Sequence, residues 1–326
     1  MNDKKNSQKK ELSVIIVNWN SCEYLTNCIK SLYNTCRSID LQIIVVDSAS
    51  YDGSQKKVRD LFPKVQFVQL DKNIGFGRSN NKGFSFVVKE NLLLLNPDTI
   101  VKSRSIETLL DVLNSEPFFG IIGAKLIQPN GELQYSSVRA LPTPINRALD
   151  SEFLQRLLPE SNLWKTHKAY TSNIHTEVEA VDGACMMMKT DNFRKVNMFS
   201  EKYFMYGEDM DLCAKFLKIG LKNIYVPYAE VIHYGGASSS TRVDHFATIN
   251  MRRSNLIFME IHYSKFIATI YRLLQAISSL IRIMFSIPML VVRKNDARKK
   301  IIITISKWWT VFKWSIGTMT NNIDNS

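Results

Sequence analysis

The segment NLLLLNPD, residues 91–98, places four consecutive leucines directly before a polar tip that ends in the carboxylate of Asp98. A short, uninterrupted apolar run followed by a turn is typical of a strand that is buried on both faces. In an open parallel sheet, ligands bind beyond the carboxyl ends of the strands. We therefore expect 91–95 to be a central strand and Asp98 to lie in a binding site.

Three similar apolar runs precede this segment, and a helix-like stretch follows each of the four. The runs are 12–17, 41–47 and 65–70, and the stretches expected to be helical are 22–36, 53–62, 75–89 and 103–114. Strand and helix in short alternation predict an α/β fold with helices on both faces of a sheet. The polar residues at the strand ends should then meet at one edge of the sheet: Asn18, Asp47, Asp71 or Asn73, and Asn96 or Asp98.

The chain from residue 101 to 240 is less regular. Residues 120–135 predict a strand and a hairpin that turns at Asn130-Gly131. Residues 178–190 are strand-like, and 223–236 are typical of two short strands. Residues 207–220 have the periodicity of an amphipathic helix that ends at Gly220. Residues 140–177 contain three prolines and little periodicity, so we interpret them as a flexible insertion.

Composition indicates a folded protein and an unevenly charged one. Of the 326 residues, 45% are hydrophobic and 22% charged, which excludes a fibrous or disordered chain. The N-terminus, MNDKKNSQKK, contains no apolar segment typical of a secretory signal, and five cysteines without a CxxC pair favour free thiols in a reducing compartment. We expect a polar tail at 1–10, an α/β domain at 11–240 and a helical region at 241–326.

Seven segments occur in the order seen in family-2 glycosyltransferases, and the resemblance covers about residues 11–260. The chain is most similar to the bacterial rhamnosyltransferase-type members that build cell-surface polysaccharides. The resemblance implies a GT-A fold, a nucleotide-diphosphate sugar as donor, inversion at the anomeric carbon and a divalent cation. It also implies that 1–100 bind the nucleotide and 101–240 the acceptor. The segments are SVIIVNWN (13–20), IIVVDSASYDGS (43–54), NIGFGRSNNKG (73–83), LLNPDT (94–99), VDGACMMMK (181–189), FMYGEDMDLCAKFLKIG (204–220) and VIHYGGASSS (231–240).

The metal site implied by the resemblance is incomplete in this sequence. The family's Asp-X-Asp motif is Asn96-Pro97-Asp98 here, so Asp98 is the expected ligand for Mg²⁺ or Mn²⁺. Such hard cations neutralise a leaving diphosphate and prefer oxygen ligands. His233 matches the position of a metal-side histidine in the family and is the expected second ligand; a purely structural histidine is the alternative.

The donor contacts are also assigned through the resemblance. Asp47 matches the residue that recognises the nucleobase, and its carboxylate can accept from the N3–H that thymine and uracil share. Asp52-Gly53-Ser54 is either a ligand contact or a helix N-cap. Asp182-Gly183 is expected to line the sugar or acceptor pocket, and Arg139 to reach the diphosphate. The expected donor-binding residues are Asn18, Asp47, Ser50, Asn73, Gly75, Arg78, Asn80, Asn96, Asp98, Arg139, Asp182 and Gly183.

The candidate acid–base residues are Glu208 and Asp209, at the start of the helix expected at 207–220. Inverting transfer needs one base that takes the proton of the acceptor hydroxyl. The resemblance assigns this role to Asp209, and Glu208 would bind the acceptor or orient the base. Adjacent carboxylates raise each other's pKa, which suits a base that works near neutrality. For Asp211, complementing the helix dipole is a sufficient role.

The C-terminal region combines positive charge with apolar residues. Residues 262–326 hold ten Lys/Arg and two Asp among Ile, Leu, Phe, Met and Trp, which indicates an anionic lipid surface rather than nucleic acid. On a helical wheel, Lys265, Arg272, Arg282 and Arg293 share one arc, so we expect a helix in the membrane interface with these cations towards the headgroups. The three tryptophans of 301–315 favour the same zone. Packing on the domain or on a second subunit of a homo-oligomer is the alternative.

We therefore expect an inverting glycosyltransferase that is peripherally attached to the cytoplasmic face of the cell membrane. Its donor would be a dTDP- or UDP-linked sugar, with rhamnose the first to test, and its acceptor a saccharide or a polyprenyl-linked glycan. One alternative is a sugar nucleotidylyltransferase, which should carry a Gly-rich basic loop after the first strand; NWNSCEYL (18–25) contains none. The other is a non-catalytic protein that binds nucleotide sugars or carbohydrate.

Overall fold

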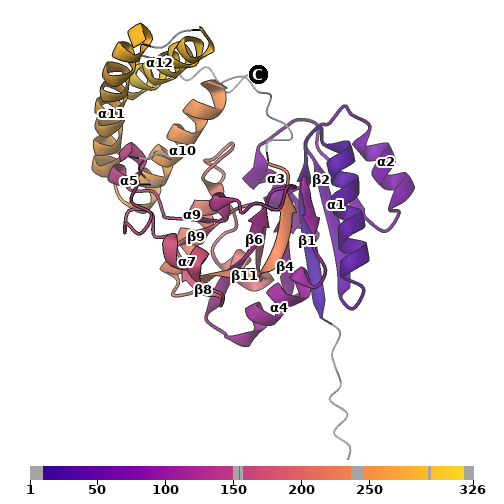
Figure 1. The fold of residues 1–326 in the computed structure, drawn as a ribbon. Helices are drawn as coiled ribbons and strands as arrows, with labels where there is room; N and C mark the ends of the chain where they lie inside the picture. The colour runs from indigo at the N-terminus through magenta and orange to yellow at the C-terminus, as the bar shows by residue number, and fades with distance from the viewer. Residues whose placement is uncertain (1–9, 150–153, 155–156, 236–244, 293–294, 319–326) are drawn as a thin grey trace, which may run out of the picture. The chain divides into compact units, whose positions relative to one another are not determined.

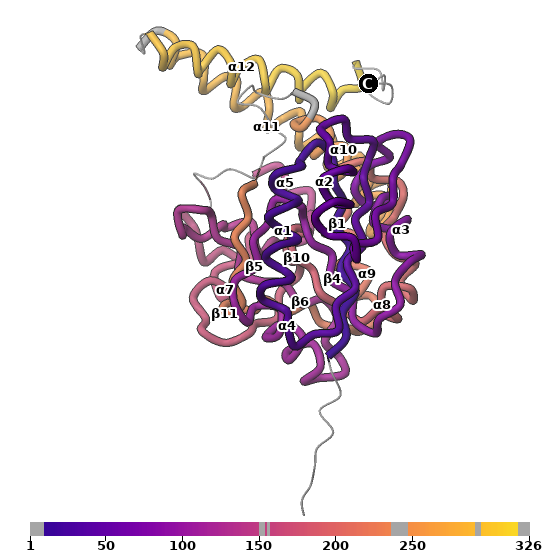
Figure 2. Tube along the Cα trace, turned by 90° about the vertical axis from the view of Figure 1, so that its right-hand side faces the viewer, coloured from indigo at the N-terminus to yellow at the C-terminus, as the bar shows by residue number. Residues whose placement is uncertain are grey.

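The computed structural model describes residues 10–149, 154, 157–235, 245–292 and 295–318. Most of the polar tail expected at 1–10 lies outside these residues. The chain divides into two compact units, which Figures 1 and 2 trace in two views. Unit 1 comprises residues 1–141, 165–204 and 208–238, and unit 2 comprises 142–164, 205–207 and 239–326. Residues 142–164, from the expected insertion, thus belong with the C-terminal helices.

Unit 1 is built on a nine-stranded mixed sheet in the order β3-β2-β1-β4-β10-β6-β11-β5, with β8 paired to β11. The first four strands in this order run parallel, whereas β10 runs antiparallel to both β4 and β6. The strands are β1 (Glu11–Asn18), β2 (Asp40–Asp47), β3 (Gln66–Gln69), β4 (Asn91–Leu95), β5 (Thr99–Val101), β6 (Phe119–Ile127), β8 (Thr176–Val178), β10 (Cys185–Lys189) and β11 (Lys222–His233); β7 (Val138–Arg139) and β9 (Ala180–Val181) form a separate pair.

Helices cover both faces of the sheet, as predicted. On one face, Leu93 of β4, Leu25 of α1 and Leu109 of α4 belong to a single core cluster. On the opposite face, α3 packs its Gly83 against Ile15 of β1. The helices of unit 1 are α1 (Cys22–Thr35), α2 (Ser54–Leu61), α3 (Phe76–Phe84), α4 (Ser105–Ser115), α7 (His167–Thr171), α8 (Thr190–Lys195) and α9 (Glu208–Lys218), with a short 3₁₀ turn at Tyr135–Ser137.

Strand β4 is the predicted central strand. Its four leucines are at most 1% exposed, because β1 pairs with one edge and β10 with the other while helices cover both faces. The five cysteines of the chain are free thiols, four of them buried and Cys22 half-buried.

Two sequence-based boundaries are wrong. Helix α3 ends at Phe84 instead of continuing to residue 89, because side chains of the neighbouring strands bind the backbone beyond it: Gln42 contacts Phe86 and Val88, and Ser13 contacts Lys89. The two strands expected in 223–236 are one strand, β11, whose pairing with β6 is irregular between Val226 and Glu230. Pro227 lies in this irregular stretch, where its missing N–H costs no ladder bond.

The regular secondary structure described for unit 2 is helical. Helices α11 (Lys265–Val292) and α12 (Asn295–Ser315) lie side by side (Figure 2), and α10 (His245–His262) and the short α5 (Pro144–Leu149) complete the unit. Ile249, Met259, Ala268, Tyr271 and Trp314 form its buried core. Part of the expected insertion, 150–153 and 155–156, lies outside the described residues.

Replacing Gly83 by Ala tests the packing of α3 on the sheet. Ala favours an exposed helix by about 1 kcal/mol over Gly, but a Cβ here would lie 2.9 Å from Cγ2 of both Ile15 and Val46. We expect Gly83→Ala to lower the free energy of unfolding by about 1–3 kcal/mol, as overpacking does, in a urea titration. The exposed neighbour gives the control, since Lys82→Ala should change stability by less than about 0.5 kcal/mol. A Gly83→Ala variant as stable as the parent would contradict this packing.

Candidate active site

Asn18 and Asp47 organise the ends of the first three strands. The register of β1 and β2 places them side by side, and Asn18 Nδ2 donates to Asp47 Oδ1 at 2.7 Å. The other oxygen, Oδ2, accepts from the backbone N–H of Ser50 at 2.8 Å and from Gln69 Nε2 at 2.7 Å. These hydrogen bonds join the ends of three strands through the carboxylate of Asp47, which is 1% exposed. The contact of Asp47 with a nucleobase stays a prediction.

The segment after β3 is fixed by its own contacts. Asn73 Oδ1 accepts from the N–H of Gly75 at 3.0 Å. Gly75 has a φ of +91°, and a Cβ at this position would lie 2.3 Å from the carbonyl oxygen of Phe204, so only glycine fits. Arg78 donates twice to the carbonyl of Glu201, and the buried Asn80 donates to that of Phe76. The contacts predicted between these residues and the donor stay predictions.

Asp52-Gly53-Ser54 forms a turn at the start of α2. Asp52 Oδ1 accepts from the backbone N–H and the hydroxyl of Ser54 at 3.1 and 2.5 Å, and Oδ2 accepts from the N–H of Cys22 at 2.8 Å. Gly53 takes a left-handed φ of +82°. The N-cap of α2 is Gly53 without a side-chain cap, so the contacts of Asp52 form a turn.

The structure brings Asp98 and His233 together. Strands β11 and β5 pair with His233 opposite Thr99, which places His233 Nε2 3.4 Å from Asp98 Oδ1. Both side chains are largely buried, at 13% and 11% exposed. Burial alone would lower the pKa of His233, but the hydrogen bond and the charge of Asp98 outweigh it and raise the pKa.

Gln134, which the sequence analysis missed, holds His233 from the other side. Its Nε2 donates to the backbone carbonyl of His233 at 2.7 Å, and its Oε1 lies 2.9 Å from His233 Nδ1. Because the amide nitrogen faces the carbonyl, the amide oxygen must accept from Nδ1–H. The proton on Nδ1 then directs Nε2 towards Asp98. A glutamine 99 residues before the histidine carries no local signal of this role.

Asp98 and His233 fit a cation that is shared with a substrate. They supply one carboxylate oxygen and one imidazole nitrogen, and the orientation of His233 by Gln134 is the support that metal-binding histidines have. Among the described residues, no group of three or more His, Cys, Asp or Glu side chains could hold a metal. Cations such as Mg²⁺ at phosphate-transfer sites commonly bind one or two carboxylates and take further ligands from substrate phosphates.

A second polar cluster joins Asp182, Arg139 and Asp209. Arg139 lies on β7, whose pairing with β9 sets it opposite Ala180 and close to Asp182. Its Nη2 contacts Asp182 Oδ2 at 2.6 Å, and its Nη1 lies 3.8 Å from Asp209 Oδ2. Backbone N–H groups fix the Asp209 carboxylate: that of Met210 donates to Oδ1 at 2.8 Å, and that of Gly183 to Oδ2 at 3.3 Å. Asp209 is 8% exposed at the first turn of α9.

The charges in this cluster affect one another. Burial raises the pKa of Asp209, Arg139 opposes this effect and Asp182 adds to it, with a raised pKa as the result. The neighbouring carboxylate that raises the pKa of Asp209 is thus Asp182 and not Glu208, which we expected from the sequence. Burial alone would lower the pKa of Arg139, but Asp182 and Asp209 outweigh it and raise the pKa. Glu208 is also buried, and Asp211 contacts Ser200 and Lys215.

The two clusters lie at the same end of β4 and β10. Leu95 pairs with Cys185, and the backbone N–H of Asn96 donates to the carbonyl of Ala184 at 3.0 Å. The N–H of Ala184 in turn donates to Asp182 Oδ1 at 2.9 Å. Asp182 also contributes to the raised pKa of His233. The end of the buried strand therefore adjoins both clusters, as the sequence predicted for Asp98.

Gln134→Leu tests the orientation of His233. We expect loss of the Nδ1–H preference in the ¹⁵N NMR spectrum of histidine-labelled protein, because the hydrogen-bond acceptor is gone. We also expect about 10–100-fold weaker Mn²⁺ binding in the presence of UDP, measured by calorimetry. Gln128→Leu, an exposed glutamine at the same hairpin, is the matched control and should leave both readouts unchanged. An unaltered tautomer in Gln134→Leu would contradict the role of this side chain.

Known proteins are similar to this chain in sequence. Residues 13–196 match the model of "Glycosyl transferase family 2", and residues 165–235 that of the "N-terminal domain of galactosyltransferase". The N-acetylglucosaminyl-diphospho-decaprenol L-rhamnosyltransferase of Mycobacterium tuberculosis is 28% identical over 243 residues, 70% of this chain and 77% of that protein. Rhamnosyltransferase WbbL of Escherichia coli is 29% identical over 167 residues, 49% of this chain and 61% of that protein.

Solved structures agree on the fold. A mannosyltransferase from Pyrobaculum calidifontis, in complex with GDP-Man and Mn²⁺, superposes with a TM-score of 0.57 at 12% identity over 96% of this chain and 89% of that one. GalNAc-T7 with UDP, GalNAc and Mn²⁺ gives 0.59 at 14% identity, over 95% of this chain and 56% of that one. Both show the predicted mixed α/β fold of GT-A glycosyltransferases. The chain belongs to glycosyltransferase family 2.

Proposed function

We propose that this glycosyltransferase transfers rhamnose, with inversion, from a dTDP- or UDP-linked donor to a lipid-linked saccharide acceptor of a bacterial cell-surface polysaccharide. The observation that carries the proposal is the meeting of the Asp98–His233 pair and the Arg139–Asp182–Asp209 cluster at one end of β4. The sugar and the acceptor rest on the rhamnosyltransferase relatives, one of which is named for a diphospho-decaprenol acceptor.

Asp209 is the base in this proposal. It takes the proton of the acceptor hydroxyl while that oxygen bonds to the anomeric carbon and the nucleoside diphosphate leaves with the electron pair of the broken bond. Its raised pKa makes it a stronger base than an exposed aspartate, and the N–H groups of Gly183 and Met210 hold its oxygens in place. Glu208, adjacent on α9, orients the acceptor.

Asp98 and His233 would hold Mg²⁺ or Mn²⁺, which when bound neutralises the negative charge of the diphosphate. The structures of the mannosyltransferase and of GalNAc-T7 contain Mn²⁺ together with a nucleotide or nucleotide sugar. In this proposal Arg139 balances negative charge beside Asp209 and the diphosphate, and Asp47 selects a nucleobase that has an N3–H. The backbone N–H of Asn96 donates to Ala184 at the end of β4. Asp98 is then the carboxylate of this segment that would bind the cation.

The proposal places the enzyme at the cytoplasmic face of the cell membrane, where a lipid-linked acceptor would be reached. Among the described residues, one helical stretch, Lys265–Leu290, is long and apolar enough to cross a membrane by length and composition. We infer peripheral attachment through unit 2, because α11 contacts the other helices α5, α10 and α12 of this unit. A homo-oligomer formed through the same helices is the alternative.

Asp209→Asn tests the base. Transfer of rhamnose from dTDP-rhamnose to an N-acetylglucosaminyl-diphospholipid should fall by about 10²–10⁴-fold, while the donor protects the variant against thermal unfolding as it protects the parent. Asp191→Asn, at an exposed carboxylate, controls for the charge change. Undiminished transfer by Asp209→Asn would refute the assignment, and retention of the donor's anomeric configuration would refute inversion.

The surroundings of Asp209 predict two opposite shifts in the pH profile. Asp209 must be deprotonated to act, so the rate falls as pH drops through its raised pKa. Asp182→Asn removes a charge that raises this pKa and should move the acid limb to lower pH; Arg139→Gln removes the charge that lowers it and should move the limb to higher pH. The check is the dependence of the transfer rate on pH, from mildly acidic to mildly basic buffers. Shifts in the same direction for both variants would contradict this coupling.

A further inference from the structure

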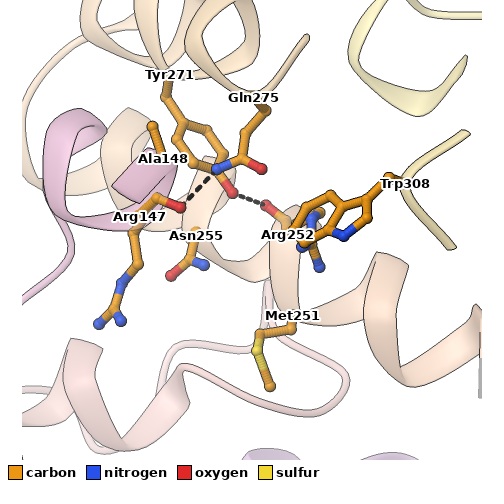
Figure 3. A pocket seen from close by; sticks show the side chains of 8 residues that line it. All are labelled: Arg147, Ala148, Met251, Arg252, Asn255, Tyr271, Gln275 and Trp308. Atoms are coloured by element: carbon orange, nitrogen blue, oxygen red, sulfur yellow. Dashed lines mark hydrogen bonds between the residues drawn. The ribbon is translucent and has the colours of Figure 1, made fainter. Parts of the chain in front are cut away.

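Helix α11 turns its polar side chains towards the other helices of unit 2. Gln275 Nε2 donates to the carbonyl of Arg147 at 2.8 Å, and Ser278 Oγ donates to that of Ala148 at 2.8 Å. The hydroxyl of Tyr271 donates to the carbonyl of Arg252 at 3.4 Å. Figure 3 shows Gln275 and Tyr271 pointing to these carbonyls around a cavity of about 40 Å³. The polar side of α11 is therefore its inner side.

The arginines of α11 lie on this inner side as well. Arg272 donates from Nε and Nη2 to the carbonyls of Ser315 and Trp314, each at 3.1 Å. The guanidinium of Arg282 lies 4.3 Å from the ring centroid of Trp308. The expectation that these arginines face lipid headgroups is therefore wrong, because their partners lie on α12; Arg293 lies outside the described residues, and Lys265 is exposed.

The outward side of α11 is apolar. We define the outer face of α11 by six residues that are 45–68% exposed: Leu273, Ile277, Leu280, Ile281, Met284 and Phe285. Their spacing of three and four residues places them along one side of the helix. Every exposed residue of α11 between 273 and 289 is apolar. A patch of this extent marks an interaction surface on a soluble protein.

Polar and apolar residues of α11 lie on the opposite sides from those expected for a helix that is exposed to water. In water, a helix is more stable with its arginines and glutamine outside and its leucines and isoleucines inside, because burying apolar surface stabilises the fold. Polar groups that are satisfied inside and apolar groups outside are typical of helices whose surroundings are hydrocarbon. The packing of α11 thus points to lipid as the medium on its outer face.

Charge favours an anionic membrane over a second copy of the chain. Lys265 begins α11, and the exposed Arg298, Lys299 and Lys300 follow its other end. The only acidic residue from 263 to 318 is Asp296. Two copies that met through this face, in either direction, would bring basic ends together. Anionic headgroups would instead attract each nearby Lys or Arg.

We propose that the outer face of α11 inserts into the headgroup–acyl boundary of an anionic membrane, with the helix lying in the membrane plane. The helix does not span in this proposal, because α5 and α12 contact its inner side and α12 carries Lys299, Lys300, Lys307 and Lys313. The inference rests on the proposed function in that it brings the enzyme to a lipid-linked acceptor.

Flotation of the full chain with vesicles tests this surface. We expect the parent to float with vesicles of phosphatidylcholine and phosphatidylglycerol and less with pure phosphatidylcholine. The double variant Ile277→Asp/Met284→Asp should bind at least about tenfold more weakly, since carboxylates are costly in hydrocarbon. Thr304→Asp, at an exposed position of α12, adds a like charge away from the outer face and should retain binding. Circular dichroism checks that each variant is folded.

Arg282→Gln tests whether Arg282 packs on α12 or contacts lipid headgroups. We expect a lower unfolding temperature, because the stacking on Trp308 is lost, with unchanged vesicle binding. If folded Arg282→Gln lost vesicle binding, Arg282 would contact lipid headgroups. The placement of the arginines on the inner side of α11 would then be wrong.

Other outcomes would also overturn the proposal. A parent chain that floats with neither kind of vesicle would do so, as would a dimer in solution that the double variant converts to a monomer, which would assign the outer face to a second copy. The test is separable from that of the catalytic proposal. The double variant should keep transfer to a water-soluble acceptor analogue, whereas Asp209→Asn should lose transfer and still float.

Discussion

The burial of β4 is the constraint on which the site depends. Its leucines are enclosed by strands on both edges and helices on both faces, so the strand cannot shift without exposing several large apolar side chains. β4 also joins the parallel strands β3, β2 and β1 to the antiparallel β10. The polar residues that follow it are therefore held by the most buried part of the sheet, and a rigid support of this kind is what a site that must position charges requires.

Two charge clusters follow from this arrangement, and in each one residue positions the side chain of another. Gln134 sets the orientation of His233 relative to Asp98, and Gly183 lets its backbone approach the Asp209 carboxylate. Arg139 lies between two aspartates and compensates part of their charge. In the proposed mechanism, one cluster serves the leaving diphosphate and the other the attacking hydroxyl.

Much of the fold and part of the site could be predicted from the sequence. The uninterrupted apolar run of β4 and the alternation around it are local signals, and they indicated the parallel half of the sheet and Asp98 at its edge. The adjacency of His233 and Asp98 followed from the family resemblance. Gln134 could not be found, because its role depends on the pairing of segments 99 residues apart. The effect of Asp182 on Asp209 likewise depends on β9 and α9 meeting in space. For α11, the helical wheel identified the arginine stripe but could not tell which side faces the protein.

The cysteines described with the fold have a practical consequence. Burial raises the pKa of the Cys28 and Cys185 thiols to about 12 and that of Cys36 to about 11, and it also raises the pKa of Cys213. Because the thiolate is the reactive form, these side chains react slowly with alkylating reagents and oxidants at neutral pH. Even the half-buried Cys22 has a raised pKa. A single cysteine introduced on the surface would thus be labelled against four nearly unreactive buried thiols, with Cys22 as the one native thiol exposed enough to compete.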